Sequence, residues 1–177
     1  MREIARRCGH VREHGSVLAG MEKRALVWIA QRLPDRVNAD HLSGLGLLAM
    51  VGSAVAFWMS NLYELALIGV LICLVVNWFG DSLDGTVARV RQQQCPNYGF
   101  YVDHVLDIIG AFFLFGGLGL SPFMSLTVAL LVLVAFLLIS AEVYLATHAR
   151  GTFNVSIFGV GPTELRILLA SGVVYLF

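Results

Sequence analysis

Charged residues are scarce in this 177-residue sequence, at 14% against about 25% in a soluble domain. Hydrophobic residues make up 58% of the chain. This balance excludes an ordinary soluble protein. Cysteine is also rare, and Cys8, Cys73 and Cys95 show no CxxC spacing, so we expect plain thiols rather than a disulfide framework. The first 20 residues lack an apolar core, so we expect no secretory signal peptide.

Long apolar runs dominate the rest of the chain, and no internal repeat or low-complexity tract divides them. Runs of about 20 apolar residues are long enough to cross a bilayer as helices. The sequence therefore predicts an all-α, polytopic transmembrane helix bundle in a single domain over residues 37–177. Five spans are predicted, over residues 42–60, 63–91, 100–120, 123–146 and 162–177. Between the second and third, Pro96 and Asn97 are predicted to form a turn.

Two segments precede the predicted domain. Residues 1–20 are polar and basic, and we expect them to be disordered. Residues 21–36 carry an apolar stripe with helical spacing and end near Pro34. With Trp28 and several basic residues beside that stripe, the segment is predicted to be an amphipathic helix on the membrane surface. An ordinary solvated helix is the alternative.

Basic residues are absent from two of the predicted connections, near residues 61–64 and 121–122. They occur before the first span, after the second span and around residue 150. By the positive-inside rule, the N-terminus and the connection between spans two and three are predicted to be cytoplasmic.

Four carboxylates interrupt this apolar sequence, at Asp81, Asp84, Asp103 and Asp107. An aspartate at the centre of a membrane helix costs about 2.5–3.5 kcal/mol, so these residues indicate a function. The spacing of each pair places it on one face of its own helix. If the two faces meet, the carboxylates repel one another, and a divalent cation relieves the repulsion. Oxygen ligands without matching Cys or His favour Mg²⁺ or Mn²⁺.

These aspartates lie in the pattern D-x-x-D-G-x-x-A-R, nine residues, G-x-x-x-D-x-x-x-D. The pattern resembles the signature of the CDP-alcohol phosphotransferases, membrane enzymes that form phospholipids by displacing CMP from a CDP-activated group. Every fixed position is present, at Asp81, Asp84, Gly85, Ala88, Arg89, Gly99, Asp103 and Asp107. The family usually has six spans, so we expect a C-terminal sixth helix to be missing from this sequence.

The resemblance assigns roles to the signature residues. It implies a pair of divalent ions, with Asp81, Asp84 and Asp103 as the core ligands. Asp107 is the implied general base and a further metal contact. Arg89 is expected to pair with phosphate or to fix a carboxylate. Three small residues are expected to let the cytidine and pyrophosphate approach the helices: Gly85, Ala88 and Gly99.

The implied partners are a CDP-activated donor, an alcohol acceptor and the lipid bilayer. A homodimer is possible, and no nucleic acid is expected. Further contacts to the acceptor or to phosphate are expected from Ser43, Glu164 and Arg166. Ser43 occupies the Thr position of a sequence similar to the family's Pro-Asn-x-x-Thr element, but Ala39 and Asp40 replace its Pro and Asn. Glu164 lies in the first turn of the fifth span, where simple helix capping is the alternative.

The sequence leaves the substrate open. Either a CDP-linked lipid reacts with a small polar alcohol, or a CDP-linked headgroup reacts with a diacylglycerol. The pair Asp103-His104 is similar to the Asp-His-x-x-Asp version found in choline and ethanolamine phosphotransferases. Two other classes remain as alternatives, an Asp-rich membrane prenyltransferase and a non-enzymatic cation-binding membrane protein.

Overall fold

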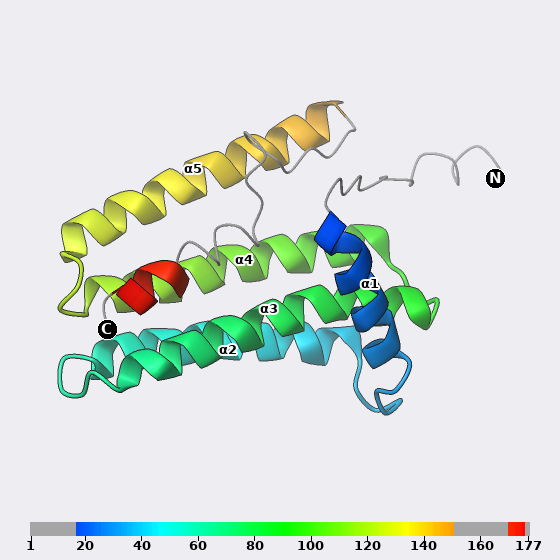
Figure 1. The fold of residues 1–177 in the computed structure, drawn as a ribbon. Coiled ribbons are helices and arrows are strands. Elements are labelled where there is room, and N and C mark those ends of the chain that lie inside the picture. The colour runs from blue at the N-terminus through cyan, green and yellow to red at the C-terminus, as the bar shows by residue number, and fades with distance from the viewer. Residues whose placement is uncertain (1–16, 151–169, 176–177) are drawn as a thin grey trace.

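The computed structural model describes residues 17–150 and 170–175 (Figure 1). In these residues the protein contains helices and no strands. Four helices are long and apolar enough to cross a membrane, which confirms the predicted polytopic bundle. The named helices are α1 (Val17–Ala30), α2 (Ala39–Met59), α3 (Ala66–Val90), α4 (Pro96–Gly119) and α5 (Leu126–Arg150).

The first four predicted spans correspond to α2, α3, α4 and α5. The predicted fifth span lies outside the described residues except for residues 170–175, which are helical. Residues 1–16 also lie outside them, and α1 begins at Val17, before the predicted boundary at residue 21.

The predicted turn at Pro96 and Asn97 is wrong, because α4 already begins at Pro96. Proline suits the first helical position, since its missing N–H would have no partner within the helix. The chain instead turns earlier, where Gln92 adopts a positive φ of 55°. That left-handed conformation is uncommon for a residue with a side chain and allows a short connection between α3 and α4.

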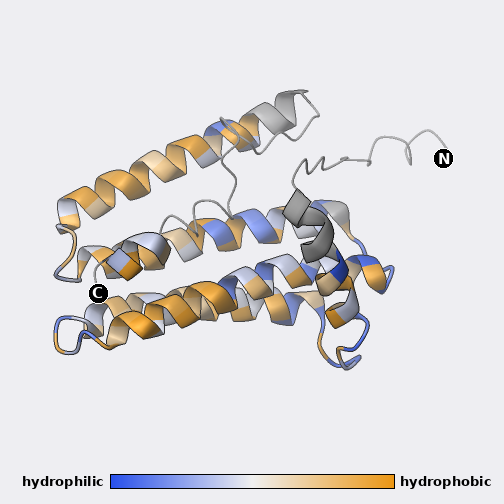
Figure 2. Cartoon of the chain, in the orientation of Figure 1, coloured by the Kyte–Doolittle hydropathy of each residue, from blue (hydrophilic) through white to orange (hydrophobic). Residues whose placement is uncertain are grey.

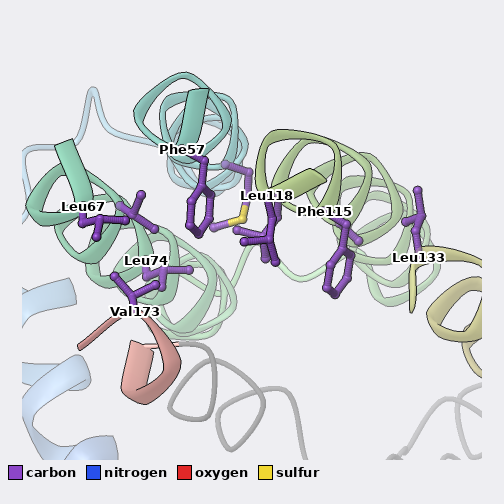
Figure 3. Close-up of a cluster of buried hydrophobic side chains, with 11 residues drawn as sticks. Phe57, Leu67, Leu74, Phe115, Leu118, Leu133 and Val173 are labelled. Atoms are coloured by element: carbon purple, nitrogen blue, oxygen red, sulfur yellow. The ribbon is translucent and has the colours of Figure 1, made fainter. Parts of the chain in front are cut away.

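Helix α2 packs against both α3 and α4, whereas the backbones of α3 and α4 come close to each other at few points. Within the described residues, the main packing partner of helix α5 is α4. Figure 3 shows the apolar core that these helices share. It contains Phe57 from α2, Leu67 and Leu74 from α3, and Phe115 from α4. The core therefore holds the helices together while α2 separates the backbones of α3 and α4.

Glycines let the backbones of α2 and α3 approach closely. A Cβ atom on Gly80 would lie 2.7 Å from the carbonyl oxygen of Leu42 and 3.1 Å from the nitrogen of Gly46. The Asn77 side-chain amide donates to the Gly46 carbonyl oxygen at 3.0 Å in the same region. These contacts fix the relative position of the two helices along their axes.

Helix α1 crosses the end of the bundle at which α3 and α4 are connected (Figure 1). Its Leu26 and Ala30 are buried in a second apolar cluster with Leu83 and Val87 of α3. Trp28, on the other hand, is 56% exposed. Hydrophilic residues are frequent at this end of the bundle, as Figure 2 shows. The arrangement is compatible with a helix that lies along a membrane surface.

The contact between α2 and α3 predicts a specific cost for one added methyl group. Gly80→Ala forces the new Cβ atom against the backbone of α2, and overpacking of this kind costs about 1–3 kcal/mol. We expect a lower thermal unfolding midpoint for the purified protein in detergent. Gly44→Ala in α2 is the matched control, because no described atom outside its own helical surroundings lies within 4 Å of its Cβ position. Equal midpoints for the two variants would contradict the close approach.

Candidate active site

The four aspartates lie at the end of the bundle that carries α1. Asp81 and Asp84 belong to the C-terminal part of α3, and Asp103 and Asp107 to the N-terminal part of α4. The short connection over residues 91–95 makes α3 and α4 antiparallel neighbours in the chain. All four side chains are partly buried.

The carboxylates meet across the two helices. The carboxylate of Asp103 interacts electrostatically with those of Asp107 on its own helix and of Asp81 and Asp84 on α3. Two ionised carboxylates about 4 Å apart repel by ~1–4 kcal/mol at effective dielectrics of 80 to 20. A proton or a cation shared between them removes that repulsion. The acidic groups therefore form one electrostatic unit, even though the backbones of α3 and α4 make few contacts.

Both oxygens of Asp84 are held by hydrogen-bond donors. The Ser43 hydroxyl of α2 donates to Oδ2 at 2.5 Å. The backbone N–H of Gly85 donates to Oδ1, also at 2.5 Å. Ser43, which the sequence suggested as a substrate contact, is thus brought to a carboxylate of the signature.

The donor chemistry of this cluster fits a hard divalent cation, because its ligand atoms are carboxylate oxygens. The fit is incomplete in the present geometry. Among residues 17–150 and 170–175, no three Asp, Glu, His or Cys side chains form a group that could hold a metal ion as they stand. The metal ligands thus stay a prediction, and closing the site on an ion requires side-chain rearrangement.

The small signature residues leave space beside the acids. No described atom lies within 4 Å of the position of a Cβ on Gly99, beyond the glycine's immediate chain surroundings. At Gly85 the nearest such atom is the flexible Arg89 guanidinium, at 3.8 Å. Arg89 itself is exposed and donates from Nε to the Gly85 carbonyl oxygen at 2.9 Å. Ala88 is partly buried one turn after Asp84. A ligand can therefore approach this side of α3 and α4.

An aromatic group borders the acids on the side of α5. The ring centroids of Phe100 and His104 are 4.0 Å apart, and those of His104 and Tyr144 are 4.4 Å apart. His104 Nδ1 lies 3.7 Å from Asp103 Oδ2. Tyr144 was not predicted as a site residue, although its position near the end of an apolar span was a usable signal. Glu142, the single acidic residue of α5, is exposed.

In the sequence, Arg91 contributed only to the predicted orientation in the membrane. In the structure, its side chain donates hydrogen bonds to four carbonyl oxygens. Its guanidinium donates to carbonyl oxygens in the connection between α1 and α2. The acceptors are those of Val37 at 2.5 Å, Pro34 at 2.9 Å, Leu33 at 3.2 Å and Asp35 at 3.5 Å. Arg91 thus ties the beginning of α2 to the end of α3.

Two predicted contact residues, Glu164 and Arg166, lie outside the described residues. Their roles stay predictions.

The family model of CDP-alcohol phosphatidyltransferases matches residues 37–177, which is most of the chain. The chain belongs to this family. No curated protein matches it.

Family membership makes the protein a transferase of substituted phosphate groups in phospholipid biosynthesis. A CDP-alcohol is the donor, an alcohol is the acceptor, and the enzyme is a multi-pass membrane protein. The matched region contains the signature residues on α3 and α4 as well as Ser43 on α2. It excludes α1, which precedes residue 37.

The Arg91 contacts predict that a lysine cannot replace this arginine. Lysine carries a single ammonium group and lacks the planar fork of the guanidinium. Hydrogen bonds to charged groups contribute about 1.5–3 kcal/mol, and Arg91→Lys loses part of several. We expect faster amide hydrogen exchange over residues 31–38. Arg36→Lys, at an exposed position in the same connection, is the control. Unchanged exchange in Arg91→Lys would contradict a clamping role.

Proposed function

We propose that this protein transfers a substituted phosphate from a CDP-activated donor to an alcohol at the acidic end of α3 and α4, in a reaction that depends on divalent metal. The observation that carries this proposal is the interaction of Asp103 with Asp81 and Asp84 across two helices of the family-matched region. Such a concentration of carboxylates is costly in a membrane protein unless cations or protons balance it.

Asp81, Asp84 and Asp103 are the proposed metal ligands, together with Asp107, which interacts with Asp103. Bound Mg²⁺ or Mn²⁺ would neutralise charge on the donor's pyrophosphate and on the leaving CMP. The open side of Gly85 and Gly99 is where the nucleotide would approach. Arg89 is exposed beside Gly85 and would pair with phosphate.

Asp107 is the proposed general base. It accepts the proton of the acceptor hydroxyl, whose oxygen then forms a bond to the phosphorus of the transferred group. The bond between that phosphorus and the bridging oxygen of the pyrophosphate breaks, and CMP leaves with the bridging oxygen. Asp107 suits this role because it lies one helical turn beyond Asp103 and interacts with it.

The acceptor is not assigned. His104 follows Asp103 directly and contacts both Phe100 and Tyr144. The Asp-His form of the motif argues against glycerol phosphate as the acceptor and does not choose among the remaining alcohols. Both reaction directions therefore belong in the test.

The test is release of CMP by membranes that contain the protein, with Mg²⁺ or Mn²⁺ and with EDTA. One panel supplies CDP-diacylglycerol with different alcohols, and the other supplies CDP-choline or CDP-ethanolamine with diacylglycerol. We expect metal-dependent release with one donor and acceptor pair. Failure of a folded protein to release CMP in either panel would contradict the proposed reaction.

Two variants then separate the proposed roles. Asp107→Asn is expected to abolish measurable turnover, because loss of a general base lowers the rate by about 100-fold or more. Binding of the CDP substrate should be largely kept. Asp84→Asn is expected to weaken both. Binding measured by equilibrium dialysis with a radiolabelled CDP-alcohol distinguishes them. If Asp107→Asn loses binding as severely as Asp84→Asn, Asp107 is not the base.

The proposed orientation places this end of the bundle and α1 on the cytoplasmic side. It is supported by the basic residues of α1 and its surroundings and by Arg32, whose guanidinium carbon lies 3.9 Å from the Trp28 ring centroid. Stacked, exposed Trp and Arg side chains suit the interface between lipid headgroups and water. The interfacial role of α1 and the homodimer both stay predictions.

Cys95 reports this orientation, because it is an exposed free thiol in the connection between α3 and α4. In a variant with Cys8→Ser and Cys73→Ser, a membrane-impermeant maleimide should label Cys95 in inverted vesicles but not in intact cells. Labelling from outside intact cells would reverse the proposed topology.

A further inference from the structure

We infer that Ser43 of α2 is a positioning residue for Asp84, one that presets this carboxylate for a divalent cation. The inference rests on the proposed function. It goes beyond the signature, because Ser43 lies outside the signature and on a different helix from all four aspartates. Its expected role was contact with the substrate, whereas the contact in the structure is with a proposed metal ligand.

The direction of the Ser43 hydrogen bond follows from its two possible acceptors. Ser43 Oγ lies 2.5 Å from Asp84 Oδ2 and 3.2 Å from the carbonyl oxygen of Ala39, one turn back in its own helix. A hydroxyl has only one proton to donate. The charged acceptor favours Asp84, because hydrogen bonds to carboxylates are stronger than those to neutral groups.

The close approach of α2 and α3 creates this contact. Gly46 lies one turn after Ser43, and Gly80 lies one turn before Asp84. Because the backbones meet at these two glycines, the short serine side chain reaches across to the carboxylate. The Asn77 hydrogen bond to Gly46 fixes the register on which that reach depends.

The consequence is a carboxylate whose orientation is set from both sides. Ser43 holds Oδ2, and the Gly85 N–H holds Oδ1. Each carboxylate oxygen can accept from more than one partner, so these bonds do not prevent Asp84 from binding a cation. Partners that orient a metal ligand commonly change metal affinity by about 10–100-fold when they are removed. Ser43 should therefore affect metal binding even without substrate.

The test is a Mn²⁺ titration of the full chain in lipid nanodiscs, without nucleotide, followed by the electron paramagnetic resonance signal of free Mn²⁺. Ser43→Ala should weaken binding by about 10-fold or more, whereas Ser43→Thr, which keeps the hydroxyl, should recover most of the affinity. The matched control is Ser53→Ala in the same helix. Ser53 is fully buried and donates to the Ala49 carbonyl oxygen within α2 at 3.1 Å, away from the aspartates, so this variant should bind Mn²⁺ as the wild type does.

Thermal unfolding midpoints in the absence of metal check that each variant is folded. If Ser43→Ala does not fold, Ser43→Cys supplies the second variant, because a thiol is a weaker donor and the same loss of Mn²⁺ affinity is expected.

The outcomes separate the two proposals. Folded Ser43→Ala that binds Mn²⁺ as tightly as the wild type overturns the positioning role, and loss of CDP-alcohol binding in that variant would instead identify Ser43 as a substrate contact. A wild type that binds no Mn²⁺ while releasing CMP with EDTA present overturns both the metal dependence and this inference. A wild type that binds Mn²⁺ but releases no CMP counts against the proposed reaction. In that case the Mn²⁺ affinities of the Ser43 variants still test the positioning role.

Discussion

The backbone contact between α2 and α3 at Gly46 and Gly80 is the constraint on which the geometry of the site depends. Without side chains at these positions, the two helices approach until the Leu42 carbonyl oxygen lies 2.7 Å from the position that a Cβ atom of residue 80 would occupy. That approach brings Ser43 within hydrogen-bonding distance of Asp84. It also makes α2 part of the site, although none of the four signature aspartates lies on it.

Helix α2 has a second role, because it packs against α3 and α4 together. Asp103 of α4 can then interact electrostatically with Asp81 of α3, although the backbones of the two helices come close at few points. Gly85 and Gly99 also leave open space beside the acids. The arrangement suits the proposed function, in which two substrates and metal ions would meet at this end of the membrane bundle.

Much of this fold could be predicted from the sequence, because apolar length marks a membrane helix without reference to its neighbours. The spacing of Asp81 and Asp84 likewise places them on one face from local geometry alone. Contacts between helices depend on register, which no local pattern sets. The pairing of Ser43 with Asp84 and the four acceptors of Arg91 could therefore not be predicted. Pro96 shows a different limit, since proline can either end one helix or begin the next.

The most direct test of the account is to locate the metal. Crystals of the protein grown with Mn²⁺ and a CDP-alcohol should give an anomalous scattering peak between α3 and α4. We predict that oxygens of Asp81, Asp84 and Asp103 lie about 2.0–2.4 Å from that peak, as expected for hard cations bound to carboxylates. Nucleotide bound without a peak at these carboxylates, or a peak elsewhere in the protein, would contradict the central claim.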